Sequence, residues 1–190
     1  MSAIAGIYRR DKQEMVSDEL SEMTEILAHR GPDGVDVWRD RSIGLGHRML
    51  WSTPESLLEK LPLTQSNLTI TADARIDNRS ELIPQIGLGN RPPEKITDSE
   101  VILAAYKKWG EHCPEELLGD FAFAIWDGPK QRLFCARDHF GMKPFYYYAS
   151  EALFVFATEI KALFCVKGIP RELNRLRMGD YLLSKFHDTA

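Results

Sequence analysis

The chain has 190 residues, of which 44% are hydrophobic and 27% are charged, as expected of a globular protein with one core. The net charge is −4 and the basic residues are scattered, which argues against a nucleic-acid-binding surface. The apolar stretch at the N-terminus covers only 3–8, and no later stretch approaches about 18 apolar residues, so we expect neither a signal peptide nor a transmembrane helix.

The first half of the chain is predicted to combine short strands with helices. Residues 3–8 form an apolar stretch typical of a buried strand, and the spacing of Leu20, Met23 and Leu27 predicts a helix over 17–28. The elements predicted after it are strands over 35–39 and 43–50, an ordered loop over 51–67, a strand over 68–74 and a short helix over 79–86.

The second half opens with a clear helix signal. Thr97 and Glu100 have the spacing of a capping box, which predicts a helix running to about Trp109. The alternating apolar residues of 121–126 predict a strand. Further strands are expected over 132–137, 145–148 and 153–157, and a helix over 158–165. The pattern alone therefore indicates an α/β or α+β protein with stacked sheets, and indicates no function.

The cysteines and histidines bear on compartment and metal binding. Cys113, Cys135 and Cys165 are odd in number and widely spaced, which is typical of reduced thiols in a cytosolic protein. The five histidines form no pair with the spacing of metal ligands on one helix. We therefore expect a cytoplasmic protein without a metal site.

Several segments together resemble, in order, the class II glutamine amidotransferase domain of the asparagine synthetase family. They are MSAIAG at 1–6, HRGPDG at 29–34, GHRML at 46–50, TDSEVIL at 97–103, ARDHFGMKPFYY at 136–147 and FATEIKAL at 156–163. The resemblance implies an α+β fold, the N-terminal-nucleophile αββα sandwich, in which two packed antiparallel sheets carry helices on their outer faces. It implies an amidotransferase-like domain over 1–165, with 166–190 leading toward a C-terminal synthetase domain absent from this chain.

Ser2 stands where the family has its cysteine nucleophile, and Ala3 stands where the family has glycine. If Met1 is removed, the α-amino group of Ser2, with an ordinary pKa of about 7.7–8.0, could act as the base for its own hydroxyl. A hydroxyl is a weaker nucleophile than a thiol. Ser2 alone therefore leaves both an active and an inactive site open.

The remaining pocket positions depart from the pattern of active family members. Met49 occupies the position of the arginine that binds the glutamine carboxylate in the family. Asp73, Ala74 and Arg75 occupy the positions of an Asn-Gly-Glu segment, whose Asn and Gly form the oxyanion hole and whose Glu helps to hold the substrate. Asp98 keeps the family's acidic residue, which holds the substrate ammonium, although acidic residues also favour a helix N-terminus for their own sake.

These departures predict a glutaminase that is inactive or nearly so. Loss of one oxyanion donor costs about 2.7–4 kcal/mol, and the carboxylate of Asp73 can only accept hydrogen bonds. Loss of the arginine leaves the substrate carboxylate unpaired, at a cost of about 2–5 kcal/mol. Even the low ends sum to roughly 5 kcal/mol, between three and four powers of ten in rate. We therefore expect a scaffold or docking domain of an ATP-dependent amide-forming enzyme.

Segments 49–56 and 72–79 are most similar to the lasso-peptide macrolactam cyclases, which share with β-lactam synthetase a reaction that needs no ammonia. The chain has neither a Ser-Gly-Gly-x-Asp-Ser segment nor a Gly-x-x-x-x-Gly-Lys-[Ser/Thr] loop. We therefore expect no cofactor in this chain, and ATP and Mg²⁺ only in the C-terminal synthetase domain. That domain is the expected partner; homodimer formation stays open, and neither nucleic acid nor a membrane is expected as a partner.

Two enzyme readings remain as alternatives. One is the amidotransferase domain of a glutamine-hydrolysing asparagine synthetase, in which Ser2 acts slowly and Arg48 or Arg75 binds the substrate carboxylate instead. The other is an N-terminal serine hydrolase for a different amide, such as a cationic one attracted to Asp73 and Asp98. The product of the full-length enzyme, whether asparagine, a β-lactam, a macrolactam or another amide, is left open.

Overall fold

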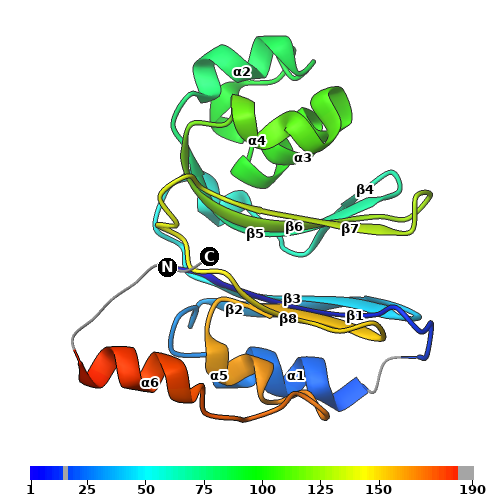
Figure 1. Ribbon diagram of the computed structural model, residues 1–190. Coiled ribbons are helices and arrows are strands. Elements are labelled where there is room, and N and C mark those ends of the chain that lie inside the picture. The colour runs from blue at the N-terminus through cyan, green and yellow to red at the C-terminus, as the bar shows by residue number, and fades with distance from the viewer. Residues whose placement is uncertain (15–16, 184–190) are drawn as a thin grey trace.

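Two antiparallel sheets face one another, and helices cover the outer face of each (Figure 1). The computed structural model describes residues 1–14 and 17–183. The layer order, helices, sheet, sheet and helices, is that of the predicted αββα sandwich. Among the described residues, every helix is too short or too polar to cross a bilayer.

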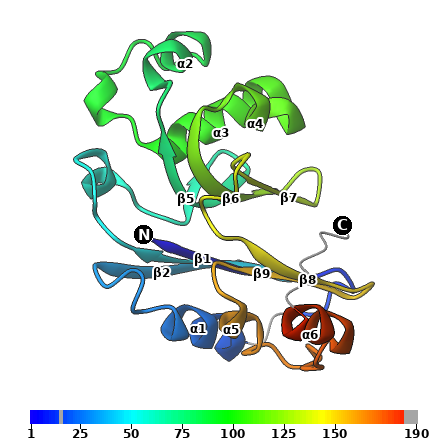
Figure 2. The ribbon, with the colours of Figure 1, turned by 60° about the vertical axis from the view of Figure 1, so that its left-hand side comes forward.

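The first sheet has the strand order β2-β3-β1-β9-β8. Its strands are β1 (Ala3–Arg9), β2 (Gly34–Asp40), β3 (Ile43–Met49), β8 (Tyr146–Ala149) and β9 (Leu153–Ala157). Helices α1 (Ser17–Ile26) and α5 (Ile160–Leu163) lie on its outer face, on the side away from the second sheet, and α6 (Arg175–Leu182) lies beside them (Figure 2). The N-terminal strand is thus central, because β3 and β9 pair with its two edges.

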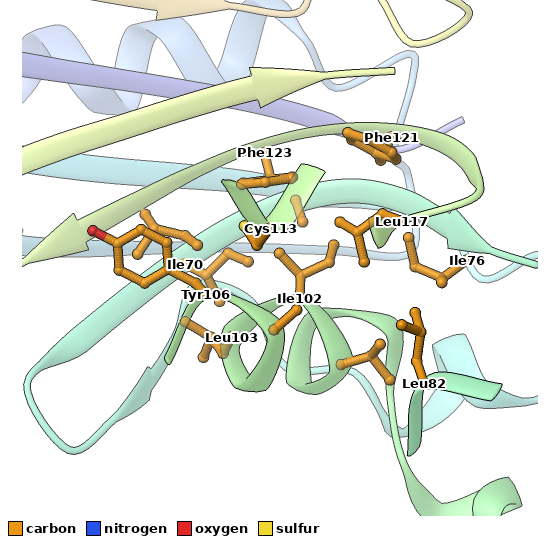
Figure 3. Packing of buried hydrophobic residues seen from close by; sticks show 14 of the residues in the cluster. Ile70, Ile76, Leu82, Ile102, Leu103, Tyr106, Cys113, Leu117, Phe121 and Phe123 are labelled. Carbon is orange, nitrogen blue, oxygen red and sulfur yellow. The ribbon is translucent and has the colours of Figure 1, made fainter. Parts of the chain in front are cut away.

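The second sheet has the order β4-β5-β6-β7 and is covered by α3. Its strands are β4 (Leu63–Gln65), β5 (Leu68–Ile76), β6 (Gly119–Asp127) and β7 (Arg132–Arg137). The other elements of this half are η1 (Glu55–Leu58), α2 (Arg79–Gln85), η2 (Pro93–Lys95), α3 (Asp98–Trp109), η3 (Gly110–His112) and α4 (Cys113–Glu116). Figure 3 shows Ile102 and Tyr106 of α3 packed toward Ile70 and Phe123 of the sheet, all of them buried.

Both faces of strand β6 are buried, which is why its residues 121–126 are continuously apolar. Phe121 and Phe123 belong to the cluster beneath α3, whereas Ala122, Ala124 and Trp126 belong to the cluster between the two sheets. Successive side chains of a strand point to opposite faces, so both faces of this strand are buried. The strand predicted over 121–126 is confirmed.

The predicted capping box is also confirmed. The Thr97 side chain accepts a hydrogen bond from the backbone of Glu100, and the Glu100 carboxylate accepts one from the Thr97 N–H at 2.9 Å. Both bonds satisfy backbone donors that the first turn of a helix leaves unpaired. Asp98 is consequently the first helical residue, which fixes the direction of its side chain relative to β5.

The ordered loop predicted over 51–67 contains two short regular elements that the prediction missed. The segment contains the 3-10 helix η1 and the short strand β4, which pairs with β5 across a tight turn in which Ser66 has a φ of 58°. Elements of three or four residues are too short to show a hydrophobic period, so their sequence gave no signal. The predicted helices over 17–28 and 158–165 are shorter in the structure than expected, because their ends form turns.

Candidate functional site

One cavity of about 320 Å³ lies where the first strand begins, beside the end of β3, the middle of β5 and the first turn of α3. The predicted site residues, Ser2, Met49, Asp73, Ala74, Arg75 and Asp98, all line it. Since they come from four separate segments, the fold brings together the positions that the family resemblance selected. Their roles in chemistry stay predictions.

Ser2 is 8% exposed and forms part of the cavity wall. Its hydroxyl oxygen accepts a hydrogen bond from the Leu50 N–H at 3.0 Å and lies 4.0 Å from the Met49 sulfur, to which it donates. These contacts hold the hydroxyl against the end of β3. Met1 precedes it in the sequence and also lines the cavity, so Ser2 has a free α-amino group only if Met1 is removed.

Asp73 lies on β5 and is 6% exposed. Its Oδ1 accepts a hydrogen bond from the Lys143 Nζ at 2.8 Å, and both side chains are largely buried. Its second oxygen, Oδ2, is buried and has no hydrogen-bond partner among the described residues. The carboxylate at the position of the family's oxyanion donor is therefore held in an ion pair.

Lys143 is a cavity residue that sequence reasoning missed. It follows a turn that Asp138 closes by accepting the N–H groups of Met142 at 2.8 Å and Lys143 at 2.9 Å. Burial alone would raise the pKa of Asp138, but these backbone hydrogen bonds outweigh it and lower the pKa. The turn is thus held in place by a charged carboxylate, and it directs the Lys143 side chain toward β5.

Arg75 and Asp98 are both in ion pairs. The Arg75 guanidinium donates to Asp77 at 3.0 Å and lies 3.3 Å from Asp120, and its side chain is 57% exposed. Asp98 pairs with Arg79 of α2. Asp98 therefore does more than place a negative charge at the start of α3, because it also ties that helix to α2.

Met49 lies at the position expected for the arginine that would bind the substrate carboxylate, and it is buried at the end of β3. The neighbouring Arg48 points to the opposite face of the strand, as predicted, where its Nε donates to the Thr24 carbonyl at 2.8 Å and its guanidinium pairs with Glu25. This placement rules out Arg48 as a substitute clamp. Arg75 is then the arginine that lines the cavity.

Glu59 is a second lining residue that the sequence did not single out. Its Oε1 accepts hydrogen bonds from both the N–H and the hydroxyl of Ser99, each at 2.8 Å. Burial raises the pKa of the Glu59 carboxyl, because the hydrogen bonds from Ser99 offset the desolvation only in part. The residue lies in the segment that was predicted to be a loop, so nothing in the sequence pointed to its burial.

The described residues contain no group of three or more His, Cys, Asp or Glu side chains that could hold a metal ion. Burial raises the pKa values of Cys113 and Cys135 to about 12, so both thiols stay protonated at neutral pH. The side chains that line the cavity offer the chemistry of hydroxyls, carboxylates and two basic groups.

The comparisons with known proteins agree with this geometry. Residues 1–190 match the model of a family described as the glutamine amidotransferase domain. Asparagine synthetase [glutamine-hydrolyzing] 3 of Bacillus subtilis is 32% identical over 174 residues, which cover 89% of this chain and 28% of that protein. Asparagine synthetase B [glutamine-hydrolyzing] of Escherichia coli is 30% identical over 190 residues, which cover 97% of this chain and 33% of that protein. The chain thus spans about a third of the length of these relatives.

Solved structures support the fold independently. The glutamine phosphoribosylpyrophosphate amidotransferase of Bacillus subtilis, complexed with ADP and GMP, superposes with a TM-score of 0.67 at 18% identity, over 86% of this chain and 43% of that one. A structure described as the allosteric regulatory enzyme of purine biosynthesis gives a TM-score of 0.65 at 16% identity. At such identities the likeness concerns the fold, which is the α+β N-terminal-nucleophile sandwich. The chain therefore belongs to the family of glutamine amidotransferase domains.

Proposed function

We propose that this chain is the N-terminal amidotransferase-like domain of an asparagine synthetase-related, ATP-dependent amide-forming enzyme, and that it no longer hydrolyses glutamine. In this proposal, residues 1–165 act as a scaffold and docking domain, and 166–190 lead to a C-terminal synthetase domain of the same protein. That domain would bind ATP and Mg²⁺. The coverage of about a third of each relative supports the proposed second domain.

The observation that carries the proposal is the ion pair between Asp73 and Lys143. An oxyanion hole needs hydrogen-bond donors aimed at the oxygen that becomes negative in the transition state. Asp73 presents an acceptor at that position, and its Oδ1 is held there by the 2.8 Å contact with the Lys143 Nζ. A developing oxyanion beside it would be repelled, which raises the barrier to hydrolysis.

The substrate-binding end of the cavity supports the same conclusion. Met49 places a thioether at the position of the family's carboxylate-binding arginine, and Arg48 is engaged on the other face of its strand. The hydroxyl of Ser2 is hydrogen-bonded to Leu50 and Met49 in the wall. Binding of the glutamine carboxylate, activation of the Ser2 hydroxyl and stabilisation of the oxyanion are thus each weakened.

Within the family we place the parent enzyme nearest to the lasso-peptide macrolactam cyclases and β-lactam synthetase. Segments 49–56 and 72–79 carry this resemblance, and they contribute Met49 and Asp73 to the cavity wall. In such enzymes an amine of the substrate itself attacks an acyl-adenylate. Ammonia from glutamine would then have no use, which accounts for a cavity without glutaminase groups.

The second candidate is a glutamine-hydrolysing amidotransferase domain with Ser2 as its nucleophile. Arg75 favours it, since its exposed guanidinium lines the cavity and could turn toward a substrate carboxylate. That turn would break the contacts of Arg75 with Asp77 and Asp120. The relatives whose names include glutamine hydrolysis also support this candidate.

Ammonia release from glutamine separates the two candidates. The purified chain is incubated with millimolar glutamine beside the matched variant Ser2→Ala. We expect the two rates to be equal. Turnover that disappears in Ser2→Ala would overturn the proposal and establish the second candidate. The intact mass gives an independent check, because retention of Met1 excludes the α-amino group of Ser2 as a base.

A further inference from the structure

We propose that the cavity binds a small organic cation with a primary ammonium or guanidinium group, and that Glu59 and Asp73 hold the cationic group. The inference deepens the proposed function, because it treats the cavity as a binding site rather than a glutaminase site. The proposed ligand presents a positive charge to the cavity. Glutamine would instead present its carboxylate to Arg75 or Lys143.

The charges of the cavity wall favour a cation. The ionisable side chains that line it are Glu59, Asp73, Asp98, Asp120, Arg75 and Lys143. Three of the four carboxylates are in ion pairs with Lys143, Arg79 and Arg75. Within residues 1–14 and 17–183, Glu59 is the carboxylate of this wall with no basic side chain at salt-bridge distance.

The Glu59 carboxyl group is fixed in a position where it can contact a ligand cation. Its Oε1 accepts two hydrogen bonds from Ser99 at the start of α3, which fix the carboxyl group in the wall. Burial without a positive partner makes its charged form costly. A ligand ammonium beside Glu59 would supply the missing counter-charge and favour the ionised carboxylate.

Asp73 offers the second contact. Its Oδ1 is used by Lys143, whereas its Oδ2 is buried without a hydrogen-bond partner among the described residues. Buried polar atoms are normally paired, so an orphan acceptor on a cavity-lining side chain points to a donor that comes from outside the chain. A modest rotation of the carboxylate would bring this oxygen to the ligand, and Lys143 could follow because its side chain is flexible.

The size and remaining surface of the cavity restrict the ligand further. A volume of about 320 Å³ is at the lower end for ligand pockets, so the ligand is small. Met49, Ala72 and Ala74 supply apolar wall suited to methylene groups. The basic side chains of the wall already have carboxylate partners, which disfavours an anionic ligand. A short alkylamine or an alkylguanidine meets all these conditions.

The test is a ligand titration of the 190-residue chain, followed by NMR. The probes are butylamine and agmatine, with 1-butanol as the neutral match of butylamine. We expect saturable binding of both amines and none of the alcohol. The variants Glu59→Gln and Asp73→Asn should each weaken binding by about tenfold, since each removes one charged hydrogen-bond partner. Glu59→Gln keeps an oxygen for Ser99, and Asp73→Asn keeps one for Lys143.

Asp120→Asn is the matched control, because it removes a carboxylate of the same wall that is already paired with Arg75. It should bind the amines within about twofold of the unmodified chain. Absence of saturable binding, unchanged affinity in both test variants, or an equal loss in Asp120→Asn would each overturn the inference.

One readout needs no variant. Nuclear Overhauser contacts between the butylamine methylenes and the Met49 methyl group are expected in the unmodified chain, and saturable binding without them would place the amine elsewhere and overturn the inference. Ammonia release is measured separately. Failure of amine binding without glutamine turnover refutes this inference alone, whereas turnover dependent on Ser2 refutes the proposed function.

Discussion

The core between the two sheets and the cavity at its edge are built from the same strands, yet they differ in chemistry. In the core, Ile4, Leu45 and Phe156 pack against Ala124 and Trp126 of the facing sheet. The cavity wall carries Met49 from the end of β3, and Asp73 and Arg75 from β5. The family fold thus resides in the core, and the cavity at the strand ends can change its side chains without changing the layers.

The largest expected effect is gain of glutamine hydrolysis when the cavity alone is rebuilt. The combined variant is Ser2→Cys, Met49→Arg, Asp73→Asn, Ala74→Gly and Arg75→Glu. Restoring a clamp and an oxyanion hole should return roughly 5 kcal/mol, or between three and four powers of ten in turnover. Ammonia release measures it. A well-folded variant without turnover would contradict the assignment of these positions, and the same variant with Ser2→Ala in place of Ser2→Cys is the control.

Substitutions in the core should change the stability of the protein rather than its activity. Phe156 is fully buried and its ring stacks on Phe145 at 5.1 Å between centroids. Phe156→Ala should lower the free energy of unfolding by about 3–5 kcal/mol, because it leaves a cavity. Urea unfolding measures this. Val35→Ala, at an exposed position of β2, should stay within about 0.5 kcal/mol.

The Asp73–Lys143 pair lies on the boundary between the two regions. Lys143→Met should cost about 3 kcal/mol in unfolding free energy, because it leaves a buried carboxylate without its partner. Adding Asp73→Asn to Lys143→Met should recover most of that loss, since the uncompensated charge is gone. Urea unfolding of the unmodified chain, the single variants Lys143→Met and Asp73→Asn, and the double variant completes a double-mutant cycle. A loss in the double variant equal to the sum of the losses in the two single variants would mean that the pair is not coupled.

The buried His47 side chain should give the free energy of unfolding a smaller dependence on pH. His47 is 1% exposed, its Nδ1 lies 3.2 Å from the Thr71 hydroxyl, and burial lowers its pKa from 6.5 to about 3. Below pH 6.5 the unfolded chain binds a proton that the folded chain refuses, so stability falls as pH drops toward 3. This contribution is about 1.4 kcal/mol per pH unit.

Urea unfolding between pH 7 and pH 5 measures the slope. His47→Gln should unfold with a shallower dependence on pH than the unmodified chain, whatever its stability at pH 7. Parallel slopes for the two chains would show that His47 binds its proton equally well in the folded and the unfolded chain, and would contradict the lowered pKa. The comparison removes the contribution of the carboxylates, which titrate in both chains.

Local patterns predicted what local forces determine. The capping box of Thr97 and Glu100, the alternation of β6 and the placement of Arg48 on the outer face all follow from periodicity and short-range hydrogen bonds, and the structure confirms them. The site positions came from ordered motifs of a family, and the fold brings them around one cavity. Their shared location could be predicted because the motif order fixes the topology.

The ion pairs could not be predicted in this way. Asp73 and Lys143 are 70 residues apart, and their contact depends on how the 138–143 turn is closed by Asp138. Glu59 lies in a segment whose elements are too short to leave a periodic signal. Tertiary packing determines which acidic and basic side chains form ion pairs. The electrostatic character of the cavity therefore emerged only from the structure.

The central place of β1 has a consequence for how the protein is made. This strand is the first of the described strands to be synthesised, yet Ala5 pairs with Ala157 of β9, which is the last of them. One edge of β1 can meet β3 early, but the other stays unpaired until β9 has been synthesised. Such long-range pairing slows folding and leaves an open strand edge exposed during translation. Strand β1, which directly follows Ser2, is therefore synthesised before every other described strand and is among the last to be fully paired.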